Sequence, residues 1–425
     1  MTADRDPEPA GYSTSDRPPT RGEPLQSEAP TRHPALAVVR GITRIGGHLA
    51  REAVTRPQAM HAADVPVTGR ELTTDWLTAV LCYDHPGAVV EAFDIADKSS
   101  GTSTRWKLTV GYNEIGRAAG LPENLFAKTT AGFKQRLTLD LADIMHGEPG
   151  FFKHVRPNLE IEAPRGYHSA VDSRSGRSIS LLEDIVSTKG ASFCTPGTPI
   201  GREQIEDLLR TMATWHARYW DDEGLRLHTW LKAPRAHFAN LDRLIGMSKR
   251  ARVGARRAAS VIPDVLPAQH DRLYRALERS LEIASTGPQT FLHGDSHIGN
   301  TYVTAAGRMG FTDWQVVLRG NWAYDFAYVV TSGLDVADRR AWERELLTGY
   351  LARLADCGAP APDFDTAWLA YRQQALYPYF IWLSTIGHSA IQPKYQPDEV
   401  CLGIIERTAT AVVDLDAAGA VEATG

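Results

Sequence analysis

The sequence predicts an α+β fold made of two lobes, a small N-terminal lobe with an antiparallel sheet and a larger, mainly helical C-terminal lobe. Runs that alternate between apolar and polar residues and are rich in strand-forming side chains occur between residues 89 and 185. Apolar residues recur at helical spacing over 204–220 and again over 270–284. With 425 residues, the chain is long enough for two domains or for one large domain with two lobes.

Composition and spacing divide the chain into segments. Residues 1–34 are rich in proline and charge and poor in large apolar side chains, which predicts a disordered tail. Over 35–56, apolar residues and arginines alternate at helical spacing. This stretch is expected to lie on the protein itself or to contact a membrane surface or a partner. The remaining expected boundaries are an arm or helix over 35–67, the N-terminal lobe over 68–187, the C-terminal lobe over 188–418 and a tail over 419–425.

The overall composition excludes several classes of protein. Hydrophobic residues make up 43% of the chain and charged residues 23%, as in ordinary globular proteins. A net charge of −5 gives no basic excess for binding nucleic acid. The four cysteines are scattered, without a C-x-x-C pair, which predicts reduced thiols in a cytoplasmic protein. We find neither a run of 18 apolar residues nor the apolar core of a signal peptide, so no transmembrane segment is expected.

The first expected strands form a hairpin. Residues 89–97 and 105–112 alternate, and the segment between them, Lys98-Ser-Ser-Gly-Thr-Ser-Thr104, is small and flexible. Backbone N–H groups in such a turn can approach phosphate oxygens. The candidate phosphate-binding residues are therefore Ser99, Ser100, Gly101 and Thr102, although an ordinary hairpin turn explains the same sequence.

Lys128 lies in the next expected strand, 124–129, among apolar residues. A lone charge in such surroundings is costly unless it is paired. Glu148 follows twenty residues later, and helical spacing over 133–145 can carry the chain between them. Other carboxylates that could pair with the lysine are Glu123 and Asp143.

The stretch with the most chemical content is His293-Gly-Asp-Ser-His-Ile-Gly-Asn300, followed by Phe311-Thr-Asp-Trp-Gln315. Residues 301–304 and 309–312 are expected to form a short hairpin with its turn at 305–308. Folding this hairpin brings the end of the first stretch next to the start of the second.

This hairpin would place Asn300 and Asp313 at the same end. Two oxygen ligands suit Mg²⁺, which keeps several waters and takes its other ligands from phosphate. Asp295 lies close by without a ligand role, so it can accept a proton from an attacking hydroxyl group. Together these side chains provide what phosphoryl transfer from a nucleotide to an alcohol requires.

The same stretch resembles the catalytic segment of the aminoglycoside phosphotransferase and choline-kinase superfamily, in which H-G-D-x-x-x-x-N precedes an aspartate at the end of a hairpin. The Asp313-Trp-Gln sequence is most similar to the ecdysteroid-kinase-like branch. The resemblance implies a bilobal, protein-kinase-like fold, with ATP as phosphate donor and Mg²⁺ as cofactor. It makes Asp295 the catalytic base and Asn300 and Asp313 the metal ligands, while His293 and Asp325 would hold the catalytic loop.

In the N-terminal half, the resemblance makes Lys128 the residue that contacts the α- and β-phosphates, held by Glu148. Residues 178–185 correspond to the strand that leads into the hinge between the lobes. The main-chain groups that would meet the adenine belong to Glu183, Asp184 and Ile185, although a plain edge strand fits the local sequence equally well.

The acceptor is inferred from the residues of the helical half. The segment 368–382 is rich in tryptophan, tyrosine and phenylalanine and carries few carboxylates, whereas relatives that modify aminoglycosides need acidic clusters to hold polycationic sugars. We therefore expect a neutral or lipophilic molecule with a hydroxyl group, although aromatic stripes also pack in cores. The choice between ATP and GTP and the oligomeric state stay open.

Two other functions remain open at this point. His293, Asp295 and His297 would share one face of a strand, and such a set can hold zinc in a metal-dependent hydrolase. A kinase-like protein that binds nucleotide without catalysis is the second, since the expected hairpin turn holds a single glycine. His216, on the helical stripe over 204–220, is expected to be a core histidine.

Overall fold

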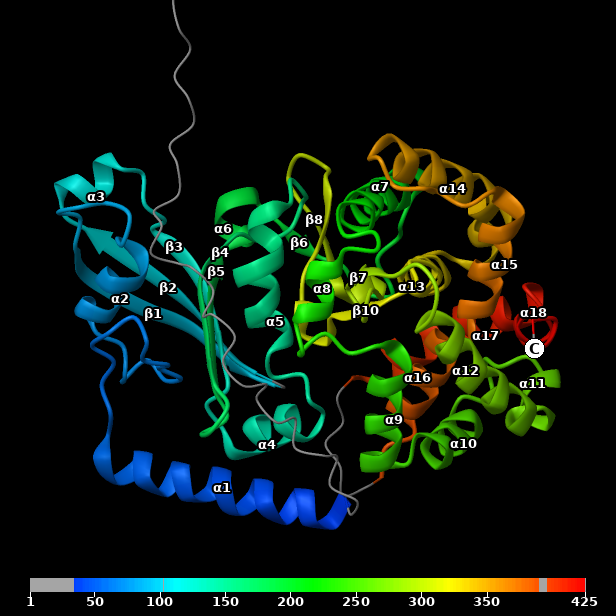
Figure 1. Ribbon diagram of the computed structural model, residues 1–425, viewed down its shortest axis with the longest axis horizontal. Helices are drawn as coiled ribbons and strands as arrows, with labels where there is room; N and C mark the ends of the chain where they lie inside the picture. The colour runs from blue at the N-terminus through cyan, green and yellow to red at the C-terminus, as the bar shows by residue number, and fades with distance from the viewer. Residues whose placement is uncertain (1–33, 102, 390–395, 425) are drawn as a thin grey trace, which may run out of the picture.

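The computed structural model describes residues 34–101, 103–389 and 396–424. The expected tail lies outside these residues except for Pro34, and so does Thr102. The chain forms two lobes side by side, one built on a sheet and one built of helices (Figure 1). The predicted α+β class, with a small antiparallel-sheet lobe and a larger helical lobe, is confirmed.

The N-terminal lobe contains a five-stranded antiparallel sheet with the strand order β1-β2-β3-β5-β4. The strands are β1 (Val90–Ser100), β2 (Thr104–Tyr112), β3 (Asn124–Thr129), β4 (Gly166–Asp172) and β5 (Arg177–Glu183). β5 lies between β3 and β4, so the alternative of a plain edge strand for residues 178–185 is wrong.

The two faces of this sheet differ in character because side chains alternate along each strand. On one face, Trp106 and Leu125 pack with Trp76 of α2 (Thr74–Leu81) in a separate hydrophobic core. The opposite face carries Lys128, which contacts groups of the helical lobe. One face of the sheet thus packs on an apolar core, and the other places Lys128 toward the segment 293–315.

The β1–β2 hairpin is longer than the alternation predicted. Ser99 pairs with Arg105 and Ser100 with Thr104, so these serines belong to the strand. β1 ends at Ser100 and β2 begins at Thr104, and the Gly101 N–H donates to the Ser103 carbonyl oxygen at 2.9 Å. Ladder pairing extends further than the small side chains indicated, because serine and threonine tolerate extended backbone.

Short helices connect the strands of this lobe. They are α3 (Glu114–Ala118), α4 (Phe133–Leu141), α5 (Gly147–Gly150), a π-helical turn at Phe151–Val155, a 3₁₀ turn at Arg156–Asn158 and α6 (Ile185–Lys189). The helix that starts with α5 belongs to the core of the helical lobe, since the Phe151 ring stacks on the Trp314 ring at 3.8 Å.

The C-terminal lobe is mainly helical. Its helices are α7 (Arg202–Arg218), α8 (Glu223–Leu227), α9 (Pro234–Ile245), α10 (Met247–Arg257), α11 (Val265–Ala268), α12 (His270–Ala284), α13 (Ala323–Gly333), α14 (Val336–Asp356), α15 (Phe364–Gln374), α16 (Leu376–Ile386), α17 (Asp398–Asp414) and α18 (Ala417–Glu422). All residues of α13 are buried, which places this helix at the centre of the lobe. Because Ala420 and Val421 of α18 are buried, the expected tail over 419–425 is wrong for residues 419–422.

Two small sheets carry the segment 293–315. β7 (Thr290–Leu292) pairs with β10 (Leu318–Gly320), and β8 (Thr301–Val303) lies between β6 (Ser192–Phe193) and β9 (Met309–Phe311). Short 3₁₀ turns lie at Ile298–Asn300 and Trp314–Val316. The β8–β9 hairpin is where the sequence predicted it.

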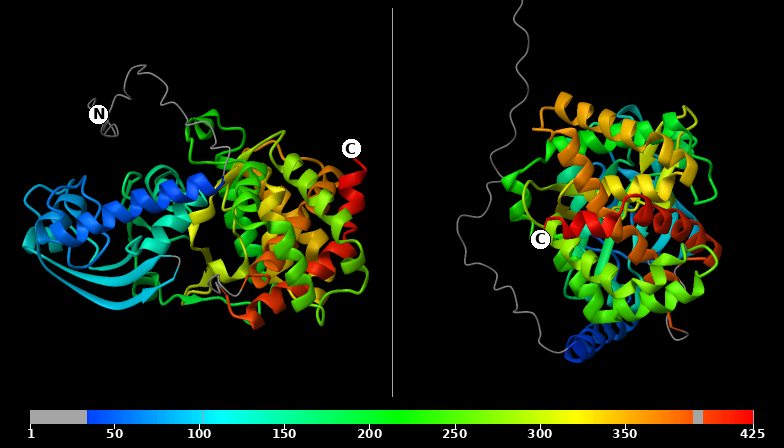
Figure 2. Two further views of the ribbon diagram at one scale, coloured as in Figure 1. Left: turned by 90° about the horizontal axis from the view of Figure 1, so that it is seen from below. Right: turned by 90° about the vertical axis from the view of Figure 1, so that its right-hand side faces the viewer.

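A long helix, α1 (Pro34–Thr55), lies on the outside of the molecule (Figures 1 and 2). It packs along α4, with Ile45 fully buried, and Arg44 forms an ion pair with Asp140 at 2.6 Å. One face of the helix therefore lies on the protein itself, which was the first of the two possibilities for this segment. Its outer face leaves several apolar side chains exposed, namely Leu36, Val39, Ile42 and Val54.

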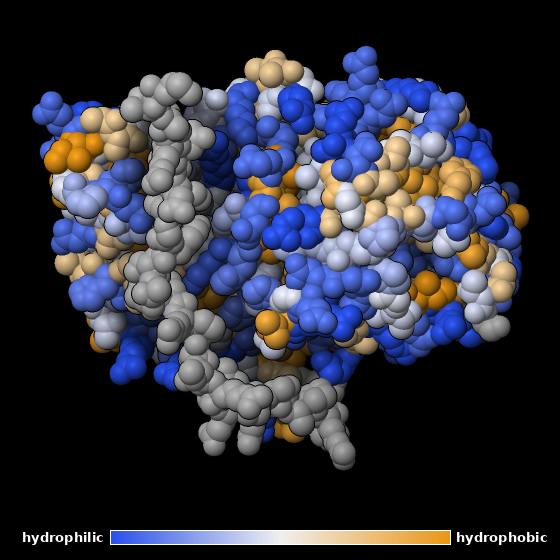
Figure 3. Space-filling model, turned by 45° about the horizontal axis from the view of Figure 1, so that its top comes forward, coloured by the Kyte–Doolittle hydropathy of each residue, from blue (hydrophilic) through white to orange (hydrophobic). Residues whose placement is uncertain are grey.

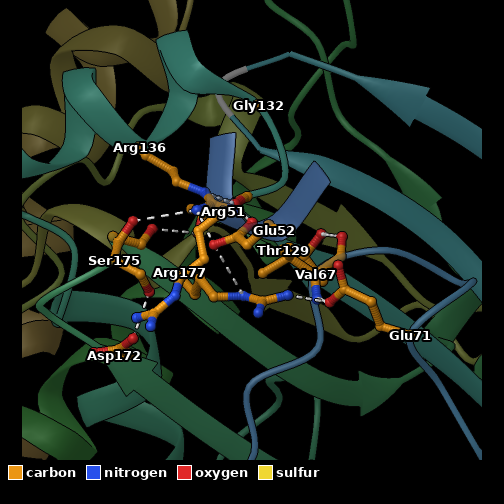
Figure 4. A network of polar contacts seen from close by, with 12 residues as sticks. Arg51, Glu52, Val67, Glu71, Thr129, Gly132, Arg136, Asp172, Ser175 and Arg177 are labelled. Atoms are coloured by element: carbon orange, nitrogen blue, oxygen red, sulfur yellow. Dashed lines mark hydrogen bonds and ion pairs between the residues drawn. The ribbon is translucent and has the colours of Figure 1, made fainter. Parts of the chain in front are cut away.

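A buried arginine joins α1 to the sheet lobe (Figure 4). The Arg136 guanidinium donates to both carboxylate oxygens of Glu52, at 2.8 and 2.7 Å, and to the carbonyl oxygens of Thr130 and Ser175. Arg136 is fully buried. The carboxylate from α1 thus supplies the charge that a buried guanidinium requires.

The described part of the chain contains no helix that could span a membrane. None of the helices there combines the length and the apolar character that crossing a bilayer requires. On the face shown in Figure 3, hydrophobic side chains are interspersed with hydrophilic ones.

Replacement of Glu52 by alanine is expected to destabilise the protein by about 3 kcal/mol or more, because it leaves the buried Arg136 without its counter-charge. The free energy of unfolding, measured by urea denaturation, checks this. The matched control is Glu91→Ala, which removes an exposed carboxylate 4.0 Å from Arg117 and should change stability by less than about 0.5 kcal/mol. Equal effects of the two substitutions would contradict the role of Glu52.

Candidate active site

The segment after β7 is held by a carboxylate from the central helix. Asp325 of α13 accepts hydrogen bonds from the backbone N–H of His293 at 2.6 Å and of Gly294 at 3.0 Å. The Ser296 hydroxyl donates to the carbonyl oxygen of the same aspartate at 3.1 Å. Asp325 is fully buried and is the third residue of its helix, so its role here is to fix the loop and not to cap α13.

His293 and Gly294 have separate duties in this loop. The His293 ring accepts the backbone N–H of Asp295 at Nδ1 (3.3 Å), and its Nε2 donates to the Thr312 carbonyl oxygen at 2.9 Å. The ring therefore joins the loop to the hairpin. Gly294 has φ +79°, and a β-carbon there would lie 2.0 Å from the Val316 carbonyl oxygen, so only glycine fits.

Asn300 and Asp313 lie at the same end of the β8–β9 hairpin. The Thr312 N–H donates to the Asn300 carbonyl oxygen at 2.8 Å. The Asn300 amide nitrogen donates to the Asp295 carbonyl oxygen at 2.8 Å and to its carboxylate at 3.1 Å, which leaves the amide oxygen for another partner. Asp313 has φ +58°, an uncommon backbone conformation for a residue other than glycine.

Lys128 reaches this end of the hairpin from the sheet lobe. Its ammonium nitrogen lies 2.8 Å from the Asp313 Oδ1 atom and 2.7 Å from the Glu148 Oε1 atom. Lys128 and Glu148 are buried. Of the two other candidates, Asp143 instead lies 3.0 Å from Lys232, and Glu123 is exposed. The structure thus selects Glu148 from the three carboxylates that the sequence left open.

Two carboxylates that share one ammonium acquire different proton affinities. Burial raises the pKa of Glu148 above its ordinary value, with Lys128 opposing. Burial alone would also raise the pKa of Asp313, but the ion pair with Lys128 lowers it to about 2. Burial disfavours the charged form of Lys128, and the two carboxylates outweigh burial, so the pKa of Lys128 is raised. Asp313 is therefore ionised at neutral pH, as a ligand for a hard cation must be.

Asp295 is oriented by a chain of side-chain hydrogen bonds from the helical lobe. The indole N–H of Trp382, which can only donate, lies 2.8 Å from the Tyr328 hydroxyl oxygen. The Tyr328 hydroxyl must therefore give its proton to the Asp295 Oδ1 atom, 3.1 Å away. The second carboxylate oxygen receives the Asn300 amide, so both oxygens have fixed positions.

Four buried side chains near Asp295 are neutral at pH 7. Burial lowers the pKa of His297 below its ordinary value and the pKa of His237 to about 4. Burial raises the pKa of Tyr328 and of Tyr377 above the ordinary tyrosine value. His297 Nε2 lies 3.8 Å from Asp295, and its ring meets that of Trp382 edge to face. Uncharged, largely aromatic side chains thus lie next to Asp295 on this side.

The expected nucleotide contacts of the sheet lobe are placed as follows. Ser99 and Ser100 lie on β1, the Gly101 N–H is already bonded, and Thr102 lies outside the described residues. The cradle of free backbone N–H groups expected in this turn is therefore absent at Gly101.

Only some backbone N–H groups of the hinge residues 183–185 are free to bind an adenine. The Glu183 N–H donates to the Arg165 carbonyl oxygen at 2.9 Å, and the Asp184 N–H makes a long contact of 3.5 Å with the Asn124 carbonyl oxygen. Asp184 caps α6 by accepting the N–H groups of Val186 and Ser187. The N–H of Glu183 is therefore not free for an adenine.

Two supporting residues were not identified as such from the sequence. Tyr328 and Trp382 orient Asp295, and the only local signal was the position of Tyr328 three residues after Asp325, on the same helical face. His216, expected in the core, is fully buried, and its Nε2 lies 3.5 Å from the Asp325 carboxylate behind the loop.

The alternative of a metal-dependent hydrolase does not fit the side chains. Both nitrogens of the His293 ring are engaged with the backbone, and the Nδ1 atom of His297 accepts the Gly299 N–H at 3.0 Å. Within residues 34–101, 103–389 and 396–424, no group of three or more histidine, cysteine, aspartate or glutamate side chains is arranged to hold a metal. The zinc set built on His293, Asp295 and His297 is therefore wrong.

The model of the phosphotransferase enzyme family matches residues 133–368, a range that includes Glu148 and the catalytic segment and begins after Lys128. No curated protein matches the sequence.

Among solved structures, the chain is similar to an aminoglycoside phosphotransferase from Streptomyces rimosus, with 16% identity over 73% of this chain and 98% of that one and a TM-score of 0.38. It is also similar to a choline kinase from Streptococcus pneumoniae (11% identity, 76% and 94% covered, TM-score 0.41). A macrolide 2'-phosphotransferase from Brachybacterium faecium gives 15% identity, 77% and 98% coverage and a TM-score of 0.40.

Stability is expected to depend on the protonation of His237. Burial holds the pKa of this side chain at about 4, whereas the unfolded chain binds the proton near pH 6.5. The unfolded state therefore binds more protons between these values, and about 3 kcal/mol of stability is lost as the pH falls from 6.5 to 4.

The His237→Gln variant should lose less stability over this pH window than the wild type, as measured by urea denaturation at each pH. Replacement of the exposed His61 by glutamine serves as the control and should keep the wild-type pH dependence. A His237→Gln variant with unchanged pH dependence would exclude this histidine as the source.

Proposed function

The chain belongs to the phosphotransferase enzyme family, and from this membership we propose that it is a small-molecule kinase. It transfers the γ-phosphate of ATP to a hydroxyl group of a neutral or lipophilic acceptor, with Asp295 as the catalytic base. The observation that carries the proposal is the convergence of an ammonium from the sheet lobe with three oxygen-bearing side chains of the helical lobe. Lys128 contacts Asp313, and Asn300 joins the end of that hairpin to Asp295.

The transfer step follows from the position of Asp295. Its carboxylate accepts the proton of the acceptor hydroxyl as the new bond from oxygen to the γ-phosphorus forms. The bond between the γ-phosphorus and the bridging oxygen breaks, and ADP leaves. Tyr328 and Asn300 hold the carboxylate so that it does not have to reorganise during the reaction.

The side chains opposite the base fit a divalent cation. The amide oxygen of Asn300 and the second carboxylate oxygen of Asp313 are hard donors that hydrogen bonds within the site leave uncommitted. When bound there, Mg²⁺ would neutralise charge on the phosphates. Lys128 contributes a fixed positive charge beside this position and is itself held by Glu148.

The surroundings of Asp295 support a neutral acceptor. Asp295 acts electrostatically on His237, His297, Tyr328 and Tyr377, and these four side chains are neutral at pH 7 because burial lowers the pKa of the histidines and raises that of the tyrosines. A polycationic acceptor would find no further counter-charge among them. Aromatic and imidazole rings instead favour an apolar or neutral alcohol.

The Asp313-Trp-Gln sequence supports the ecdysteroid-kinase-like branch of the superfamily. The scattered cysteines support a cytoplasmic location for the enzyme.

A non-catalytic nucleotide-binding protein is the remaining alternative. It is less well supported, because a decayed site would not retain the base, the two metal-binding side chains and the lysine–glutamate pair in contact with one another.

Wild-type protein is expected to bind Mg-ATP by titration calorimetry and to release ADP with hydroxylated acceptors from a chemically diverse panel. The Asp295→Asn variant should bind Mg-ATP as the wild type does and turn over about 100- to 10,000-fold more slowly, because it lacks the base. As a control, Asp97→Asn changes a carboxylate on β1 that pairs with Lys107 and should keep full activity. Transfer by Asp295→Asn at the wild-type rate would refute the assigned base, and a wild type that binds nucleotide without transfer would favour the non-catalytic alternative.

The Asp313→Ala variant should bind ATP at least about tenfold more weakly in the presence of Mg²⁺, and its affinity should no longer depend on the metal. Calorimetric titrations with and without Mg²⁺ measure this difference, and circular dichroism verifies that the variant is folded. An unchanged magnesium dependence would remove Asp313 from the metal site.

A further inference from the structure

A row of polar side chains crosses the open face of the sheet beside the catalytic segment. Directly opposite residues in antiparallel strands project from the same face, with their β-carbons about 5 Å apart. The strand register aligns five residues in this way across all five strands. In spatial order they are Ser99 of β1, Arg105 of β2, Lys128 of β3, Ser180 of β5 and Ser169 of β4.

Two cations therefore stand side by side in this row. Lys128 is already committed, since its ammonium contacts both Glu148 and Asp313. Arg105 is half-buried, and its Nε atom donates to the Ser103 hydroxyl in a long contact of 3.4 Å. Across residues 34–101, 103–389 and 396–424 we find no carboxylate within ion-pair distance of Arg105.

The position of Arg105 makes this lack of a partner informative. Like charges on directly opposite residues of a sheet repel and destabilise the pair. Arg105 nevertheless lies beside the cluster of charged groups, because its directly opposite residue is Lys128, whose ammonium contacts Glu148 and Asp313. A guanidinium with unused donors, next to a paired ammonium and a carboxylate suited to a metal, matches the needs of a bound polyphosphate.

We propose that Arg105 binds the phosphate groups of the nucleotide and is the main cation for them in the sheet lobe. The inference rests on the proposed kinase function and adds to it a residue that neither the sequence motif nor the family match assigns. The matched range begins at residue 133, beyond Arg105. Lys128 has at most one ammonium hydrogen left for phosphate, whereas the planar guanidinium offers a fork of N–H groups.

The role also accounts for the closed turn of the hairpin. The Gly101 N–H is bonded to the Ser103 carbonyl oxygen, so it is not free to hold a phosphate. The side chain of Arg105, two residues after Ser103, supplies donors at the same end of the sheet. A charged side chain would thereby bind the phosphate in place of the backbone N–H groups expected in the turn.

Titration calorimetry with Mg-ATP, Mg-GTP, AMP and adenosine tests the proposal on wild type, Arg105→Ala and Arg105→Lys. Charge-assisted hydrogen bonds contribute enough that Arg105→Ala should bind the preferred triphosphate about 10- to 100-fold more weakly. Its affinity for adenosine should change less than about twofold, because the nucleoside carries no phosphate. Arg105→Lys should recover part of the loss, since it keeps the charge without the fork.

Lys107→Ala is the matched control. Lys107 lies two residues further along β2 on the same face, but it is paired with Asp97 at 3.0 Å. Its replacement should leave triphosphate affinity within about twofold of the wild type if only the uncommitted cation binds phosphate.

The outcomes separate this inference from the kinase proposal. If wild type binds a triphosphate and Arg105→Ala binds it equally well, the role of Arg105 is refuted while the kinase proposal stands. A loss of adenosine affinity as large as that of the triphosphate would assign Arg105 a structural role and likewise refute the inference. A wild type that binds no nucleotide would overturn both.

Discussion

One buried ammonium group links the two halves of this molecule. Lys128 extends from the polar face of the sheet and is held between Glu148 and Asp313. Both carboxylates lie on elements of the helical lobe, since the helix that follows Glu148 packs on Trp314 through the Phe151 ring. A β-carbon on Gly147 would lie 2.1 Å from the Gln315 carbonyl oxygen, so backbone meets backbone between these elements. The close approach fixes Glu148 and Asp313 relative to each other, and the lysine adds the sheet to that fixed pair.

Local patterns in the sequence predicted most of what lies within one short segment. Asp295, Asn300 and Asp313 fall within a loop and a hairpin, and hairpin closure alone brings the last two together. Lys128 was singled out because a charge in an apolar strand needs a partner. The identity of that partner was beyond local reasoning, since Glu123, Asp143 and Glu148 are all near in sequence. The packing of the helix that begins at Gly147 decides the choice, and it depends on contacts with residues more than a hundred positions away.

The remaining parts of the site depend on tertiary contacts that no periodicity encodes. Trp382 of α16 reaches Asp295, in the loop after β7, through Tyr328 of α13. Away from the site, Glu52 likewise meets Arg136 over 84 residues. The hairpin turn was predicted too long, because serine and threonine residues that favour turns also continue a ladder when the facing strand is in register. The residues directly opposite Arg105 in the neighbouring strands likewise follow from strand register and not from local composition.

The apolar interior of the protein is divided into two clusters, which affects how the protein unfolds. The cluster around Trp76 and Trp106 under the sheet is distinct from the larger cluster around Trp314 and α13. Two separate cores can act as separate cooperative units, so heating or denaturant can melt the smaller one while the larger persists. A ligand that touches both units stabilises them together and draws the two melting steps toward a single transition.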